Sequence, residues 1–169
     1  MHMDPFDDPR LTAMGLLVEV ATGLTVKAHQ SFTAVGLSDV DFETLIRLAR
    51  SPRQRLRMSD LAAQTSLSTS GITRVVDRLE REGLVMREAC STDRRASYAV
   101  LTEAGAERLK AVMPQHLNDI ETYFTGLLTP QQLSDFLDAL RIIRDVVRPC
   151  ATVGVERASS EQCEGEKVS

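Results

Sequence analysis

Hydroxyl and guanidinium groups lie together on one side of a helix predicted in the middle of the chain. Ser68 is a suitable N-cap and Gly83 a suitable stop, so the helix should run to about Glu82. Its core face has the i, i+3, i+4, i+7 spacing of Ile72, Val75, Val76 and Leu79. The opposite face carries Thr69, Ser70, Thr73, Arg74, Asp77, Arg78 and Arg81. These groups can bind phosphate oxygens and base edges, and a helix N-terminus also favours phosphate. A helix that binds DNA is therefore indicated, with a solvated polar face as the alternative.

Three further charged residues mark the tip of a predicted hairpin. Residues 84–89 and 96–101 can pair as short strands, and the loop between them contains Asp93, Arg94 and Arg95. Arginines at a loop tip have no core to stabilise. They could enter a narrow minor groove, where the negative potential is concentrated, with Asp93 holding Arg95 extended. A solvated turn is again the alternative.

The elements around these residues occur in the order of a winged helix-turn-helix. A helix from Ser38 to about Arg50 opens with a capping-box pattern, and Ser59 is the expected cap of a short helix over 60–65. Ser66 and Leu67 then form the turn before the polar helix. The expected fold is mostly α with a small β-hairpin wing: a winged helix-turn-helix flanked by N- and C-terminal dimerisation helices.

Long amphipathic helices are expected on both sides of this unit. One covers residues 11–36, a second starts at Thr102 with a kink expected at Pro114, and a third starts at Thr129-Pro130. The domain prediction is an arm over 1–10, a dimerisation region over 11–36 and 102–148, a DNA-binding domain over 38–101 and a disordered tail over 149–169. The apolar faces are too wide for one small domain to cover, so a twofold dimer is favoured.

Charge and composition narrow the possible functions. The net charge is −4, but residues 51–100 carry 9 basic and 6 acidic side chains and no lysine. No apolar run is expected to span a bilayer, and no signal segment is recognised, which indicates the cytoplasm. Three cysteines and three histidines without metal-ligand spacing predict no metal site and no cofactor. No catalytic constellation is visible, so an enzyme is not expected.

The chain resembles the MarR (multiple antibiotic resistance regulator) family. The matching stretches are Ser68–Val85, Asp93-Arg94-Arg95 and Leu101–Gly105, within an order of elements that covers about residues 10–148. The resemblance implies a bacterial homodimeric regulator, with repression the favoured mode, that binds palindromic operators and is released by small, often phenolic, ligands or by thiol oxidation. It places Ser68, Thr69, Ser70, Thr73, Arg74 and Arg78 at the major groove. It also places Asp93 and Arg95 in the wing motif, with Arg94 at its variable position.

The effector is less well indicated by the sequence. Arg10, His29 and His116 are polar residues that could line a ligand pocket between the helical region and the winged domain, although a surface residue or a satisfied core polar group is the favoured interpretation of each. Residues 7–20 contain no cysteine, which departs from the peroxide-sensing members. Cys90 at the wing base is the remaining candidate for thiol regulation, with an ordinary strand-end cysteine as the favoured interpretation. A winged-helix module that binds another protein instead of DNA is the alternative function.

Overall fold

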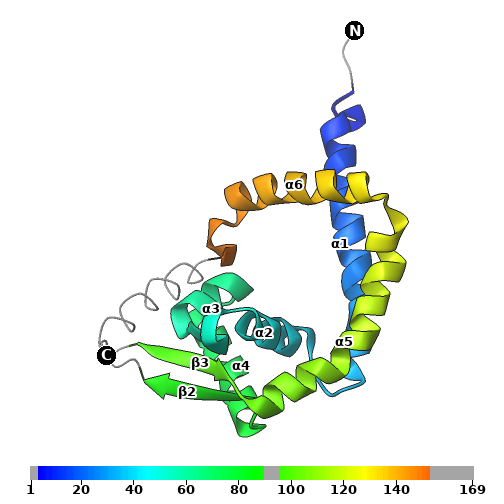
Figure 1. The fold of residues 1–169 in the computed structure, drawn as a ribbon. Helices are drawn as coiled ribbons and strands as arrows, with labels where there is room; N and C mark the ends of the chain where they lie inside the picture. The colour runs from blue at the N-terminus through cyan, green and yellow to red at the C-terminus, as the bar shows by residue number, and fades with distance from the viewer. Residues whose placement is uncertain (1–3, 90–95, 153–169) are drawn as a thin grey trace, which may run out of the picture.

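The computed structural model describes residues 4–89 and 96–152 (Figure 1). The six helices of this part are α1 (Pro9–Thr33), α2 (Asp39–Ala49), α3 (Met58–Thr65), α4 (Thr69–Arg81), α5 (Glu103–Tyr123) and α6 (Pro130–Val147). The strands are β1 (Arg55–Arg57), β2 (Val85–Ala89) and β3 (Ser97–Leu101). Four 3₁₀ turns are also present: η1 (Pro5–Asp7), η2 (Pro52–Gln54), η3 (Thr125–Leu127) and η4 (Pro149–Thr152).

The three strands and helices α2, α3 and α4 form one winged-helix domain, called the head below. The strands pair antiparallel in the order β1-β3-β2, with Leu56 opposite Ala99 and Val85 opposite Leu101. The core between the sheet and the helices is built from fully buried aliphatic side chains, among them Leu45, Leu48, Leu61, Ile72 and Val76. The mostly helical fold with a small β wing is as predicted from the sequence.

Most helix starts are capped as predicted. Ser38 and Asp41 form a reciprocal capping box at α2, and Thr129 and Gln132 form a second one at α6. The predicted cap Ser59 is wrong, because α3 already begins at Met58 and Ser59 lies in its first turn. The start of α3 follows from β1: extended Arg57 is the last residue paired with β3, and the chain enters the helix directly from it.

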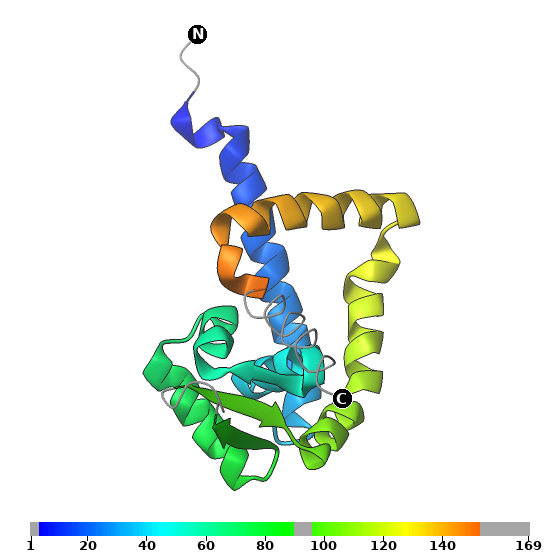
Figure 2. The ribbon, with the colours of Figure 1, turned by 60° about the vertical axis from the view of Figure 1, so that its left-hand side comes forward.

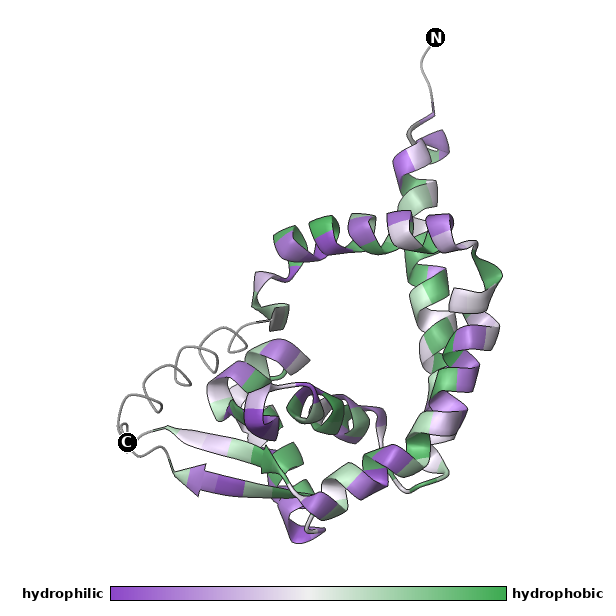
Figure 3. Cartoon of the chain, viewed as in Figure 1, coloured by the Kyte–Doolittle hydropathy of each residue, from purple (hydrophilic) through white to green (hydrophobic). Residues whose placement is uncertain are grey.

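The outer helices α1, α5 and α6 extend from the head. Figures 1 and 2 show α1 running away from the head toward the N-terminus and α5 bending along its length. Pro114 lies inside α5. Ser31 on α1 donates a 2.5 Å hydrogen bond to Asp119 on α5. In Figure 3, green apolar residues recur along α1 and alternate with purple polar residues along α6. Many of them are exposed in the described protomer, including Leu11, Met14, Val18, Val26, Ile142, Val146 and Val147.

Helix α1 departs from one expectation of the sequence analysis. Its 25 residues contain a window with a mean hydropathy of 1.4, so by length and composition it could cross a membrane. This is weak support for a membrane span, since the core helices of soluble proteins can have the same length and composition. The apolar character comes from the many aliphatic side chains around the helix.

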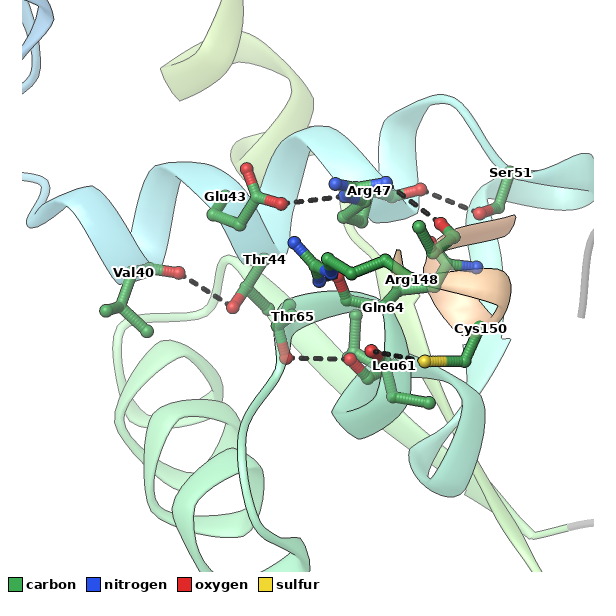
Figure 4. Close-up of polar contacts among 12 residues, drawn as sticks. Val40, Glu43, Thr44, Arg47, Ser51, Leu61, Gln64, Thr65, Arg148 and Cys150 are labelled. Atoms are coloured by element: carbon green, nitrogen blue, oxygen red, sulfur yellow. Dashed lines mark hydrogen bonds and ion pairs between the residues drawn. The ribbon is translucent and has the colours of Figure 1, made fainter. Parts of the chain in front are cut away.

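The segment predicted as a disordered tail begins with an ordered turn. Residues Pro149–Thr152 form η4, which packs against α3, and Ala151 is only 6% exposed. Hydrogen bonds from Arg47 to the Ala151 carbonyl and from Arg148 to the Gln64 carbonyl hold this end of the chain (Figure 4). The prediction failed there because it depended on periodicity, whereas the turn is fixed by tertiary contacts.

Candidate nucleic-acid interface

The N-terminus of α4 presents small hydroxyl side chains to solvent. Ser68 Oγ accepts a 3.1 Å hydrogen bond from the Gly71 amide, which confirms the predicted cap. Thr69 and Ser70 are exposed beside it. A Cβ on Gly71 would lie 3.2 Å from Ser68 Oγ, so the glycine leaves room for the cap of its own helix. The start of α4 thus offers hydroxyls and unpaired helix N–H groups on a surface without bulky side chains.

One turn further along α4, two polar residues differ in how they are engaged. Thr73 donates a 2.7 Å hydrogen bond to the Thr69 carbonyl, which leaves its oxygen as an acceptor. Arg74 is exposed, and its side chain makes no hydrogen bond or ion pair with any described residue. Arg74 is therefore the α4 guanidinium best able to bind an external anion.

Arg78 has an intramolecular partner that the sequence did not indicate. Its Nη2 donates to Oδ1 of Asp41, the buried carboxylate that also closes the capping box of α2. The contact ties the middle of α4 to the start of α2. Arg78 is still partly exposed, so it can reach DNA as predicted, but its charge is already paired with that of Asp41.

Arg87 on β2 was not singled out from the sequence, although it shapes the charge of α4. It pairs with Asp77 at 2.6 Å and with Glu80 at 2.7 Å, and its amide donates to Glu80 Oε1 at 3.1 Å. Both carboxylates of α4 are thereby held by one guanidinium from the wing side, and the group of three keeps one net negative charge. Lone charges on different elements carry no sequence signal of their pairing, so this bridge was not predictable.

A second basic group flanks the sheet. Arg55 and Arg57 lie over the ring of Tyr98, at 4.6 and 5.7 Å from its centroid, and Arg57 Nε donates to the Tyr98 hydroxyl at 3.2 Å. Both arginines belong to β1, a three-residue strand too short to show a pattern. The hairpin strands β2 and β3 are as predicted, whereas its tip, with Cys90, Asp93, Arg94 and Arg95, lies outside the described residues.

The three candidate ligand residues lie in different places. Arg10 pairs with Asp8 at 2.5 Å at the outer end of α1, where this contact raises the pKa of Arg10. It lies about 27 Å along the helix from Ala28, which lines the cavities described next. His29 Nδ1 lies 2.9 Å from Asp39 and joins α1 to α2 on the surface. The structure therefore separates Arg10 from the other two.

His116 lies at a hollow between the outer helices and the head. It lines two cavities of about 230 and 460 Å³, the larger of which also meets Phe32, Phe42 and Leu67. Its ring is 5.1 Å from that of Phe32 and 4.9 Å from that of Phe42. Burial lowers the pKa of His116, against the opposing effect of Asp119. Its Nδ1 is buried without a hydrogen-bond partner among the described residues.

A short helix, a turn and an exposed polar helix, followed by a β-hairpin, define a winged helix-turn-helix protein, a class that places one helix in a DNA groove. Residues 37–97 match the model of the MarR family. AbsC, a MarR family regulator of Streptomyces coelicolor, has a similar structure. Its sequence is 34% identical, the match covers 88% of this chain and 99% of that one, and the TM-score is 0.77. Sco3205 of the same organism, a MarR family regulator solved in complex with DNA, is also similar. Its sequence identity is 30%, the match covers 88% of this chain and 92% of that one, and the TM-score is 0.76.

Curated sequences give the same result. The transcriptional repressor MprA of Escherichia coli K12 is 28% identical over 132 residues, which are 78% of this chain and 74% of that protein. The chain belongs to the MarR family of transcriptional regulators. Members of this family are DNA-binding regulators, and membership confirms the expectation that the chain is not an enzyme.

Proposed function

We propose that the protein is a cytoplasmic repressor that binds palindromic operators as a homodimer. The observation that carries the proposal is α4, whose exposed Arg74 makes no side-chain hydrogen bond or ion pair with any described residue, while both nearby carboxylates are held by Arg87. Two relatives support it: MprA is a transcriptional repressor, and Sco3205 is a regulator solved in complex with DNA. Ser68, Thr69, Ser70 and Thr73 would accompany Arg74 at the major groove.

Arg78 and the wing complete the proposed interface. Arg78 would orient α4 through Asp41 and reach phosphate with its exposed part. Arg95 would enter the minor groove, oriented by Asp93, with Arg94 beside the backbone. This assignment predicts that sequence reading is concentrated in Arg74 and that general DNA affinity is shared by the other arginines.

The test measures operator binding by Arg74→Ala. A base-reading arginine should cost about 1–3 kcal/mol and relax preference at one position of each half-site. Arg141→Ala on α6, which is equally a surface arginine, is the control and should bind like the parent. Equal binding by Arg74→Ala and the parent would overturn the assignment of α4 as the reading helix.

We also propose that the hollow at His116 accepts a small phenolic effector. The walls supply aromatic rings, and the unpartnered Nδ1 of a neutral imidazole can hydrogen-bond a hydroxyl. Titrating the protein–operator complex with simple phenols should release DNA from the parent. In His116→Leu, which removes the polar atom, release should need much higher concentrations. Unchanged release would exclude this site.

A further inference from the structure

The end of α6 and the turn η4 close a junction with the head, whose cavity shares only Glu43 with the lining of the hollow at His116. Arg148 Nη2 donates to the Gln64 carbonyl at 2.8 Å, and Arg47 Nη1 donates to the Ala151 carbonyl at 3.2 Å (Figure 4). Gln64 and Ala151 are 3% and 6% exposed. The junction is thus held by hydrogen bonds made from both sides.

A cavity of about 350 Å³ lies at this junction. Its walls come from α2 and the residues just after it, from α3, and from α6 with η4. The lining residues are Glu43, Ile46, Arg47, Arg50, Ser51, Gln64, Arg144 and Ala151. Three guanidinium groups from two parts of the fold therefore meet around one space.

The charges around the cavity do not balance. Glu43 is the single carboxylate of the lining, and it accepts a 2.8 Å contact from Arg47. Arg144 pairs at 2.7 Å with Asp145, its sequence neighbour, which is itself 65% exposed and does not line the cavity. Arg50 is exposed and makes no side-chain hydrogen bond or ion pair with any described residue. Like charges brought together repel, and a bound anion would remove that cost.

We propose that this cavity binds a small anion with two or more carboxylate or phosphate groups. Arg50, just after α2, and Arg144, on α6, would hold it from two different elements, since guanidinium groups bind both anions through paired N–H donors. The volume is at the lower end of small-molecule sites, which fits a compact ligand. Such a ligand would join α6 to the head, and its binding requires neither DNA nor a phenolic effector.

The test is calorimetry of the full chain with citrate and, separately, with pyrophosphate, at constant ionic strength and without DNA. The parent should bind at least one of them saturably, and the stronger of the two identifies the chemical group preferred. Arg50→Ala and Arg144→Ala should each weaken that binding by at least about tenfold. Both side chains are exposed, so neither variant should lose the fold.

Arg141→Ala is the matched control. Arg141 is on the same helix as Arg144 and pairs with Asp138 at 2.6 Å, but it does not line the cavity. Its variant should bind the anion like the parent. Absence of saturable binding to either anion, or equal binding by all three variants, would overturn the proposal. Equal weakening by all three would show a general charge effect and would overturn it as well.

Discussion

The head and helix α6 contain the same aliphatic residue types, but these side chains are buried in the head and exposed in α6. In the head, Leu45, Leu61 and Ile72 are each 0% exposed. In α6, Ile142 is 70% and Val146 79% exposed, and no residue of this helix is buried in the described protomer. The head is a complete domain within one chain, whereas α6 and the outer part of α1 leave wide apolar faces exposed in the described protomer. We propose that a second copy covers these faces, in which case the apolar pattern of the sequence records contacts between two copies.

The largest effect is expected from charging the exposed face of α6. Ile142→Glu combined with Val146→Glu places two charges where we propose that a second copy packs, and should convert the dimer to a monomer in light scattering. Operator affinity should fall by about 10²–10⁴-fold, because two half-sites are no longer bound together. Ser134→Glu, a substitution at an exposed polar position of α6, should remain dimeric. A parent protein that is already monomeric at micromolar concentration would remove the basis of this comparison.

Adding one methyl group at Gly105, beside the head, or at Gly23, in α1, should show how closely each region is packed. A Cβ on Gly105, in the first turn of α5, would lie 2.1 Å from the Leu84 carbonyl oxygen, whereas one on Gly23 in α1 would meet nothing within 4 Å. Gly105→Ala should lower the free energy of unfolding by about 1–3 kcal/mol or more. Gly23→Ala should raise it by about 0.5–1 kcal/mol, through the better helix propensity of alanine. Destabilisation by Gly23→Ala would show that another chain approaches α1 closely.

Asp41 is a buried carboxylate of the head, and Asp138 is an exposed carboxylate of α6. Removing each one should show which region depends more on its charged groups. Asp41 accepts hydrogen bonds from the Ser38 amide at 3.1 Å, from the Ser38 hydroxyl at 2.6 Å and from Arg78. Asp41→Ala should cost about 2–3 kcal/mol in chemical denaturation, through lost capping and lost charge-assisted bonding. Asp138→Ala, which breaks a surface pair on α6, should cost no more than about 1 kcal/mol. Similar losses for both would contradict the view that the head is the more tightly built region.

The smallest effect on stability is expected from lowering the pH, through protonation of His116 at the boundary between the head and the outer helices. Burial lowers the pKa of His116 below its ordinary value of 6.5, so the folded chain binds this proton less readily than the unfolded chain. Stability is therefore fully present above about pH 6.5 and falls as the pH is lowered through the folded pKa. His116→Phe should flatten that decline in thermal melts. An unchanged decline in His116→Phe would show that this histidine does not cause it.

The sequence predicted what depends on local spacing and failed where distant contacts decide. The core face of α4, the Ser68 cap and the two capping boxes follow from periodicity and from residue types three positions apart. Strand β1 was missed, because its three residues are fixed only by pairing with β3. The contact of Arg78 with Asp41 joins residues 37 positions apart, and the Arg87 bridge joins β2 to α4. No local pattern distinguishes these arginines from the unpartnered Arg74.

The contact between Ser31 and Asp119 has a consequence for synthesis. The two residues are 88 positions apart, and α5 packs along α1 near this contact. At roughly 5–20 residues per second, Ser31 leaves the ribosome roughly 4–18 s before Asp119. Throughout that interval the inner end of α1 lacks the helix that packs against it, and this end is open to chaperones and to neighbouring nascent chains. The head can form in the meantime from its own residues, so translation separates the folding of the domain from the maturation of the helices around it.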